Sequence, residues 1–556
     1  MAPRKPPPSP LRPCLQMKVD ELFLRWLSDP GTQRALRAGL RRIQGPAVIL
    51  DHTVTPNPAT ALDSATKAIA APAKIAPPDP AVTPNPAAIA SSTAITKFSA
   101  SRKRNRHRAV PPRGEEPGPK APLPGRGIPA FYFPRGRPGQ GPDVDDVIAD
   151  VERAFARLPS GRAGLQDMGV VAKACCCPLY WKAPLFLAAG GGAQGGFVSA
   201  RDIIGLWKPI LLTCHDEAAR FERLLGGPGD GGLSPEDLAP LVQDVADSHP
   251  GLSFLREAEP LRRDYVTTVT QRVFYAVNRS WSGRISCQEI RRSCFLQAVS
   301  QLEAEPNPGR ATPSFFSYPH FCVIVSKFQA LDADGDGLID RHDLRRHADG
   351  AISSRMIDRI FSGAVTRARP SPEGGKMGLA DFVWFLLSEE DKTTPTSTEY
   401  WFRCMDLDGD GVLSAPELSF FYEEQAQNLA ARGAEPPPFA DLTRQALDLV
   451  QPRCPGQITL GDLKRCGLAG EFFDAFFNAD KFLEHERREP AGPVRAPDAD
   501  PTLSDWDRFA AAEYDFLLAE EAQDDDAWEE GPSPRSESPP SSPDPYDFAD
   551  DTLDPL

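Results

Sequence analysis

The chain has 556 residues, of which 59 are proline, and a formal net charge of −15. This proline share is about twice the average, so part of the chain is expected to be linker and the rest to form two to four domains. The acidic balance argues against a nucleic-acid or anionic-membrane partner. No run of eighteen apolar residues and no signal-peptide core occurs, so we expect a soluble intracellular protein.

The N-terminal third is expected to be mostly disordered around one helical element. Residues 1–16 predict disorder, whereas 17–43 carry apolar residues at helical spacing. A Ser-Asp-Pro run in this stretch ends one expected helix and begins a second. Such an amphipathic hairpin packs either on the main body or on a partner. Residues 44–127 are rich in Ala, Pro, Ser and Thr and predict a disordered linker. Its basic run 101–108 fits a nuclear localisation signal and a solvated charge run equally well. We therefore expect the protein in both the nucleus and the cytoplasm.

An extended segment, 128–142, follows the linker. It carries Phe131, Tyr132 and Phe133 between prolines that forbid a helix. Three consecutive aromatic side chains are expected to lie in a groove. The groove belongs either to this chain or to a partner, and packing on this chain is the favoured alternative.

The globular body is expected where aromatic and aliphatic residues return at helical spacing. We divide it into a first region, 143–350, and a second region, 351–490. The remaining residues, 491–556, form an acidic tail rich in Pro and Ser, with a helix expected at 503–522.

The clearest motif is the run 406–417, DLDGDGVLSAPE, here called the 406 loop. Its oxygen-bearing side chains at positions 1, 3, 5, 9 and 12 supply the ligands that Ca²⁺ requires, and Gly at position 6 permits the sharp turn. An acidic surface turn would not need this Gly together with an aliphatic residue at position 8 and an acid at position 12. The expected ligands are Asp406, Asp408, Asp410, the Val412 carbonyl, Ser414 through water and bidentate Glu417.

A second run, 332–343, repeats this pattern and is called the 332 loop. It ends in Asp instead of Glu, and the shorter side chain makes bidentate capture of the ion harder. We therefore expect a weaker site, or one that tolerates Mg²⁺. The expected ligands are Asp332, Asp334, Asp336, the Leu338 carbonyl, Asp340 and Asp343.

Five further runs keep Gly at position 6, an apolar residue at position 8 and an acid at position 12, but have lost most other ligands. They begin at residues 191, 226, 278, 370 and 451, and are named by these numbers. In the 278 loop, Asn278, Ser280 and Ser282 offer neutral oxygens only, which is too little charge to capture Ca²⁺ well. Because positions 8 and 12 also serve strand pairing and helix capping, these runs predict metal-free structural EF-hands.

The loop spacing suggests two pairing schemes. Paired EF-hand loops usually begin about 36 residues apart, which favours 191 with 226 and 370 with 406. The 332 loop would then pair with the 278 loop, and the 451 loop would form a cap. The alternative pairs 332 with 370 and 406 with 451. The predicted fold class is mainly α, with tandem EF-hand domains in which two loops are calcium-competent and the others degenerate.

The sequence contains none of the common catalytic motifs. It has no P-loop, GxSxG, HExxH or paired Cys/His zinc pattern, so we expect a protein that is not an enzyme. Its 11 cysteines suit reduced thiols better than a disulfide framework. No role is assigned to the consecutive Cys175, Cys176 and Cys177.

These motifs together resemble the B-double-prime class of regulatory subunits of protein phosphatase 2A, and within it the beta type. The resemblance covers both the N-terminal helices and the body, whereas the linker and the tail lack it. It is carried by MKVDELFLRWLS, IPAFYFPRGRP, LYWKAPLF, FYAVNRSWSGRIS, MIDRIFSGAVTR, DFVWFLLSEEDKTTPTSTEYWFRCMDLDGDGVLS and LKRCGLAGEFFDAFFN.

The resemblance implies a substrate-specifying protein that docks on the phosphatase scaffold and touches the catalytic subunit. Phosphoproteins would be the substrates of the assembled enzyme, and Ca²⁺ at the 332 and 406 loops would modulate assembly or activity. The alternative is a stand-alone calcium sensor with a groove for helical peptides. Such sensors are usually rich in Met, and this chain has only 6.

Overall fold

The computed structural model describes most of the expected body and few residues outside it. The described residues are 32–34, 133–139, 141–192, 196–227, 231–304, 315–365, 375–487 and 503–529. By its contacts the chain divides into two compact units, 20–123 and the remainder, and residues 32–34 of the first are helical. The rest of the 17–43 hairpin, the 1–16 and 44–127 segments and the tail after 529 lie outside the described residues. No single helix in the described part is long and apolar enough to span a membrane, although the bent pair Met168–Ala174 and Leu179–Ala188 would qualify by length and composition.

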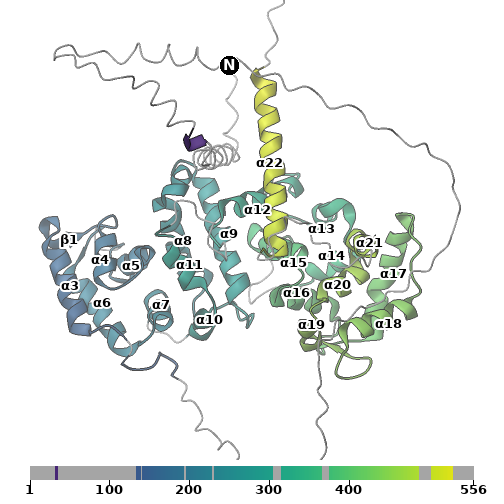
Figure 1. Ribbon diagram of the computed structural model, residues 1–556, viewed down its shortest axis with the longest axis horizontal. Helices are drawn as coiled ribbons and strands as arrows, with labels where there is room; N and C mark the ends of the chain where they lie inside the picture. The colour runs from purple at the N-terminus through teal and green to yellow at the C-terminus, as the bar shows by residue number, and fades with distance from the viewer. Residues whose placement is uncertain are drawn as a thin grey trace, which may run out of the picture. The chain divides into compact units, whose positions relative to one another are not determined.

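The described body is built almost entirely of helices, which confirms the predicted fold class (Figure 1). Short 3-10 segments (η) and four two-residue strands connect them. The first half contains α3 Val144–Ala156, η2 Pro159–Gly161, β1 Arg162–Ala163, α4 Met168–Ala174, η3 Leu179–Trp181, α5 Lys182–Ala188, β2 Val198–Ser199, α6 Ala200–Thr213, α7 Glu217–Gly226, α8 Pro235–Ser248, η4 Pro250–Glu257, α9 Glu259–Val277, α10 Cys287–Arg292 and α11 Phe295–Gln301. The second half contains α12 Tyr318–Leu331, α13 Arg341–Leu344, η5 His347–Gly350, α14 Ser354–Ile360, α15 Leu379–Glu390, α16 Pro395–Met405, β3 Val412–Leu413, α17 Ala415–Ala431, α18 Phe439–Val450, β4 Ile458–Thr459, α19 Leu460–Cys466, α20 Ala469–Phe477, α21 Ala479–Arg487 and α22 Asp505–Glu529.

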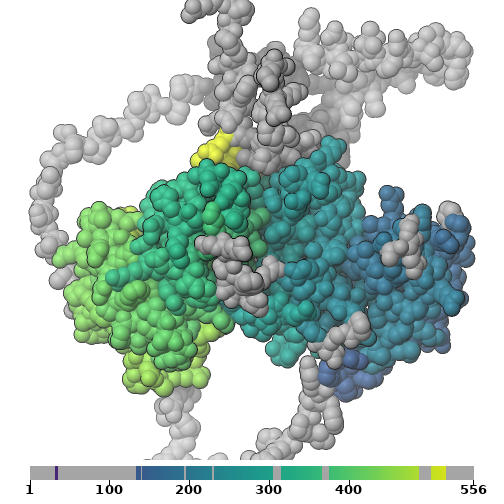
Figure 2. Space-filling model, turned by 180° about the vertical axis from the view of Figure 1, so that it is seen from behind, coloured from purple at the N-terminus to yellow at the C-terminus, as the bar shows by residue number. Residues whose placement is uncertain are grey.

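The EF-hand loops pair through their position-8 residues, each loop with a neighbour along the chain. The antiparallel contacts are Ala163 with Val198, Leu233 with Ile285, Ile339 with Met377, and Leu413 with Ile458. The 226 loop therefore pairs with 278, 332 with 370, and 406 with 451. From behind, the chain colours follow one another from blue to green across the surface, as expected for modules formed in chain order (Figure 2).

This arrangement shows that the favoured pairing scheme is wrong. The 191 loop does not pair with 226, nor 370 with 406, nor 332 with 278, and the 451 loop is a full partner of the 406 loop. A spacing of about 36 residues does not identify the partners here, because loops of different pairs, such as 191 with 226 and 370 with 406, begin about as far apart as paired loops do. The alternative scheme, 332 with 370 and 406 with 451, is the observed one. The bridge between Ile339 and Met377 also crosses the expected boundary between residues 350 and 351.

The partner of the 191 loop is an EF-like loop that the sequence reasoning missed. It spans 156–167 and has Gly161 at position 6, Ala163 at position 8 and Asp167 at position 12. Asp167 Oδ2 accepts the Gly164 N–H at 3.1 Å, as the position-12 acid does for the position-9 N–H in six of the other loops. The run GRAGLQDM fits the repeat once Ala is allowed at position 8.

The position-12 acids have a structural use that explains their survival in loops without other ligands. In six of the loops this acid closes a capping box with the residue at position 9, and so satisfies N–H groups that the first helical turn leaves unpaired. The boxes open α6, α8, α10, α13, α17 and α19. In the 451 loop, for example, Asp462 Oδ2 accepts the Thr459 hydroxyl at 2.7 Å.

The expected helix at 503–522 is present as α22, and it packs on α12 and α15 of the body (Figure 1). Its buried residues are Trp506, Ala510, Tyr514 and Leu518. Trp506 Nε1 donates to His320 Nδ1 at 3.1 Å, and the Arg272 guanidinium lies 2.7 Å from the same nitrogen. Since indole and guanidinium groups only donate, His320 Nδ1 is the acceptor, and burial lowers the pKa of His320 well below its ordinary value.

The described part of the aromatic and proline-rich segment, residues 133–139, packs on this chain. Arg291 Nη2 donates to the Pro134 carbonyl at 2.9 Å, and the His215 N–H donates to the Arg135 carbonyl at 2.7 Å. Gly136 adopts φ +86°, and a Cβ there would lie 2.7 Å from the Asp216 nitrogen, so the close approach requires glycine. The backbone of residues 133–139 thus packs on this chain, but the Phe133 side chain is 41% exposed, so the structure does not bear out a groove for this aromatic residue. Phe131 and Tyr132 lie outside the described residues.

Candidate calcium sites

The 406 loop lies between α16 and α17 and brings its first three acids together. Carboxylate oxygens of Asp406, Asp408 and Asp410 lie within 4.8 Å of one another. Gly411 adopts φ +82°, and its N–H donates to Asp406 at 3.0 Å, which closes the turn. Three carboxylates held this close repel one another unless a cation lies between them, so the donor set fits an oxygen-seeking divalent ion.

Glu417, at position 12, reaches back over the 406 loop from the first turn of α17. Its Oε1 accepts the Leu407 N–H at 2.7 Å, and its Oε2 accepts the Ser414 N–H at 2.7 Å and the Ser414 hydroxyl at 2.8 Å. Glu417 is 5% exposed. Among the described residues, no basic side chain forms an ion pair with Asp406, Asp408, Asp410 or Glu417. The negative charge of this loop is therefore not neutralised by described protein side chains.

The 332 loop has the same backbone plan but different neighbours. Carboxylate oxygens of Asp332, Asp334 and Asp336 lie within 4.8 Å of one another. Asp340 caps α13 and accepts the His342 N–H at 2.6 Å and the Asp343 N–H at 2.9 Å.

Two basic side chains pair with acids of the 332 loop. Arg346, beyond α13, lies 2.9 Å from Asp343 Oδ1, and Lys376 of the paired 370 loop contacts Asp336 Oδ2. The hydrogen bond from Lys376 is the main reason that the pKa of Asp336 lies below its ordinary value. Both cations compete with an ion for the carboxylates. They give the expected weakness of this loop a second cause, besides the short Asp343 side chain.

Removing the Lys376 charge is expected to strengthen Ca²⁺ binding at the 332 loop. In a chain whose 406 loop is disabled by Asp406→Ala and Glu417→Ala, Lys376→Met should raise the Ca²⁺ affinity roughly two- to five-fold, the range of an exposed ion pair. Isothermal titration calorimetry measures this directly. Lys208→Met on α6, which removes a lysine charge elsewhere, serves as the matched control and should leave the affinity unchanged. An equal affinity in both variants would contradict the competition.

The 278 loop places a nitrogen where an EF-hand holds its ion. Asn278 Nδ2 lies between 2.8 and 3.5 Å from the Ser280 and Ser282 hydroxyls, the Arg284 carbonyl and both Glu289 carboxylate oxygens. These atoms occupy positions 3, 5, 7 and 12, the ligand positions of a calcium loop. The Gly283 N–H donates to Asn278 Oδ1 at 3.0 Å, and this bond fixes the orientation of the amide. One buried amide thus substitutes for the cation, a role that the sequence reasoning did not find.

The comparisons with known proteins agree with this architecture. EF-hand family models match three stretches: "P2R3B, EF-hand" at 150–210, "EF-hand domain" at 216–305 and "EF-hand domain pair" at 321–423. Among the B'' regulatory subunits of serine/threonine-protein phosphatase 2A, the delta form of Mus musculus is 68% identical over 76% of this chain and 86% of its own length. The beta form of Homo sapiens is 51% identical over 95% of this chain and 91% of its own length. The chain belongs to the B'' family of protein phosphatase 2A regulatory subunits.

This family membership confirms the resemblance and its beta-like character, and it identifies the chain as a non-catalytic regulatory subunit. EF-hand domains are a calcium-binding class, so calcium is the cofactor class of this B'' protein. A solved structure titled as a PP2A PR70 holoenzyme is 56% identical, covers 49% of this chain and 99% of its own chain, and gives a TM-score of 0.47.

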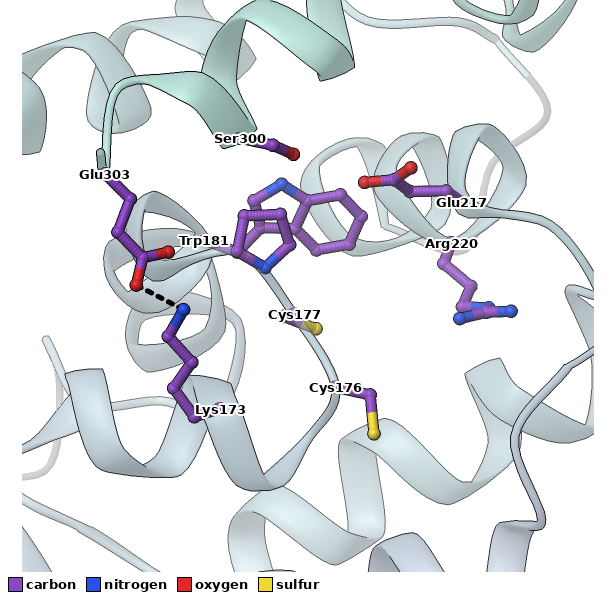
Figure 3. A pocket seen from close by; sticks show the side chains of 9 residues that line it. Lys173, Cys176, Cys177, Trp181, Glu217, Arg220, Ser300 and Glu303 are labelled. Atoms are coloured by element: carbon purple, nitrogen blue, oxygen red, sulfur yellow. Dashed lines mark ion pairs between the residues drawn. The ribbon is translucent and has the colours of Figure 1, made fainter. Parts of the chain in front are cut away.

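Two of the consecutive cysteines of this B'' protein, Cys176 and Cys177, line a cavity of about 500 Å³ (Figure 3). Trp181 lies between two charged pairs of residues, Lys173 with Glu303 on one side and Glu217 with Arg220 on the other. Burial raises the pKa of Cys177 well above its ordinary value. A protonated thiol is a poor nucleophile, so Cys177 is not an activated cysteine.

The three cysteines serve instead as the C-terminal cap of α4. Cys176 adopts φ +56°, and the Cys177 N–H donates to the Ala172 carbonyl at 2.9 Å. The Cys175 carbonyl accepts Trp207 Nε1 at 3.2 Å. All ten described cysteines of this B'' protein are free, as expected for reduced thiols.

Proposed function

We propose that this chain is a calcium-responsive B'' subunit that docks on the scaffold subunit of protein phosphatase 2A, contacts the catalytic subunit and selects phosphoprotein substrates. The proposal is supported by the family membership together with the two carboxylate clusters of the 332 and 406 loops. The names of the relatives state that they are regulatory subunits of this phosphatase, and the similarity to the human beta form extends over 95% of the chain.

Two Ca²⁺ ions are proposed, and the 406 loop is the stronger site. Its ion would be held by Asp406, Asp408, Asp410, the Val412 carbonyl and Glu417, with Ser414 acting through water. The 332 loop would use Asp332, Asp334, Asp336, the Leu338 carbonyl, Asp340 and Asp343. A bound Ca²⁺ supplies a fixed centre of positive charge that sets the angle between the flanking helices. The difference in strength is supported by the ion pairs that Lys376 and Arg346 form in the 332 loop, whereas no described basic side chain pairs with an acid of the 406 loop.

Affinity capture tests the proposal. The full chain should retain the scaffold and catalytic subunits in stoichiometric amounts, and less of both should be retained with chelator than with Ca²⁺. Asp406→Ala with Glu417→Ala should reduce the calcium-dependent part of the capture several-fold. Glu435→Ala with Asp448→Ala removes the same charge from exposed positions near α18 and should behave like the native chain. Capture that is equal across a calcium titration would contradict calcium control of assembly, and absence of capture would contradict the assignment to the phosphatase.

We further propose that the basic run 101–108 directs this chain to the nucleus, besides a cytoplasmic pool. Deleting 101–108 should reduce the nuclear fraction of a fluorescently tagged chain, because an importin recognises clustered Lys and Arg. Deleting 91–98, a stretch of the same length without basic clustering, serves as control. An unchanged nuclear fraction after the deletion of 101–108 would identify that run as a solvated charge run.

A further inference from the structure

The short helix α14 contacts both helices that flank the 406 loop. At its C-terminal half, Arg359 donates from Nε to the Cys404 carbonyl and from Nη2 to the Asp406 carbonyl, each at 2.8 Å. These carbonyls belong to the last turn of α16 and to loop position 1. They are carbonyl groups that a helix end leaves without an internal partner. Arg359 therefore fixes the point at which the entering helix becomes the calcium loop.

At its N-terminus, α14 is held by the exiting helix, α17. Glu424 Oε1 accepts the Ser354 N–H at 2.8 Å, and Glu424 Oε2 accepts the Arg355 N–H at 2.8 Å. A carboxylate at this place also interacts favourably with the helix dipole. Arg355 reaches back to α17, where its guanidinium stacks 4.4 Å from the Phe420 ring. Because Met356, Ile357 and Ile360 are buried, α14 cannot move without repacking the core.

The same helix also contacts the element that leaves the 332 loop. Arg341, the first residue of α13, lies 3.4 Å from Asp358 of α14, and its guanidinium lies 5.7 Å from the Phe361 ring just beyond α14. The backbone before α14 is anchored too, since the Ser353 N–H donates to the Phe477 carbonyl at 2.9 Å. These contacts connect α13 to α14, and α14 to both α16 and α17. The 332 and 406 loops belong to different EF-hand pairs, so this route is separate from strand pairing.

We propose that α14 couples the two calcium loops: Arg359 and Glu424 are positioning residues of the 406 loop, and occupancy of the 332 loop raises the Ca²⁺ affinity of the 406 loop through them. This inference rests on the proposed function, in which both loops bind Ca²⁺. It adds that the two ions bind cooperatively and that the cooperativity depends on side chains that are not ligands.

Calcium titration of the full chain by calorimetry tests the coupling. Two variants each disable one loop, Asp332→Ala with Asp334→Ala and Asp406→Ala with Asp408→Ala. The native chain gives two Ca²⁺ association constants, and each single-loop variant gives one. The product of the two native constants should be about five times or more the product of the two constants from the variants. With Arg359→Met and Glu424→Gln added to all three chains, the two products should agree.

Glu423→Gln is the matched control, because it removes a neighbouring carboxylate of α17 that does not bind the backbone of α14. Glu423→Gln should leave the native product of association constants as far above the single-loop product as it is without the substitution. Circular dichroism reports whether the double variant folds, and Glu424→Gln alone, which keeps the side-chain shape, gives the same comparison if it does not. Equal products in the native chain, or an excess that survives the α14 variants, would overturn the coupling. Uptake of fewer than two Ca²⁺ by the native chain would instead overturn the proposed function on which it rests.

Discussion

Replacing Asn278 by Asp is expected to make the 278 loop dependent on calcium. The substitution exchanges the amide nitrogen for a carboxylate oxygen, surrounded by two hydroxyls, a carbonyl and the Glu289 carboxylate. Residue 278 is 1% exposed, so the new charge would be buried beside the Glu289 carboxylate without a cation to offset the repulsion. Such a change costs about 3–5 kcal/mol when no cation is present. The new oxygen set resembles a calcium loop, so millimolar Ca²⁺ should recover most of the loss.

Thermal unfolding in chelator and in Ca²⁺ measures this effect, and calorimetry should count one additional Ca²⁺. Asn278→Ala is the informative control, because it removes the nitrogen without adding charge. It should destabilise the chain equally in chelator and in Ca²⁺. A similar loss for both variants under both conditions would show that the amide serves only packing and does not take the place of an ion.

Replacing Lys392 by Met is expected to cause the largest loss of stability in the second half of the body. Lys392 Nζ lies 2.6 Å from Glu389 and 2.9 Å from Asp474, and the three side chains are at most 4% exposed. Its ammonium also lies 5.5 Å from the Trp401 and Phe477 rings. Although burial raises the pKa of Asp474, Lys392 and hydrogen-bonded His485 outweigh it and hold the pKa below its ordinary value. Without Lys392 a buried carboxylate is left underpaired, at a cost of about 3–5 kcal/mol.

The pH dependence identifies the cause of this loss. Without Lys392, burial is expected to raise the folded-state pKa of Asp474 above its unfolded value, so folding then takes up a proton and the penalty shrinks as the pH falls. Urea unfolding should show a larger difference between variant and native chain at pH 7.5 than at pH 5.5. Lys464→Met is the matched control. It removes a partly exposed lysine 2.7 Å from Glu399 and should cost about 1 kcal/mol or less. Equal losses for the two variants, or a difference independent of pH, would exclude the buried carboxylate as the cause.

The repeat of positions 6, 8 and 12 was sufficient to predict the helical EF-hand fold and seven of its loops. These positions are visible in one sequence because each is required by local physics: a left-handed turn, a strand contact and a helix cap. The 156–167 loop was not predicted, because Ala163 is the smallest apolar residue and the repeat was defined with larger residues at position 8. The pairing of the loops was predicted wrongly for a different reason. The number of residues between two loops does not determine which of their strands pair.

The chemistry around the loops was predictable only in part. The convergence of Asp332, Asp334 and Asp336, and of Asp406, Asp408 and Asp410, follows from spacing within one turn. Lys376 comes from the paired loop, 40 residues after Asp336, so the 332 loop alone does not reveal it, whereas Arg346 lies three residues beyond Asp343. Asn278 was considered only as a source of oxygen ligands. Its nitrogen acquires a role only when the surrounding oxygens converge on it in space.

The docking of α22 has a consequence for how this chain is made. Trp506 donates to His320 across a separation of 186 residues, and the face of α12 that α22 covers is complete long before α22 is synthesised. At a translation rate of 5–20 residues per second, that apolar face waits roughly 10–40 seconds for its cover. A chain that stops before residue 505 lacks this cover, so the side chains of α12 and α15 on which α22 packs stay exposed to water.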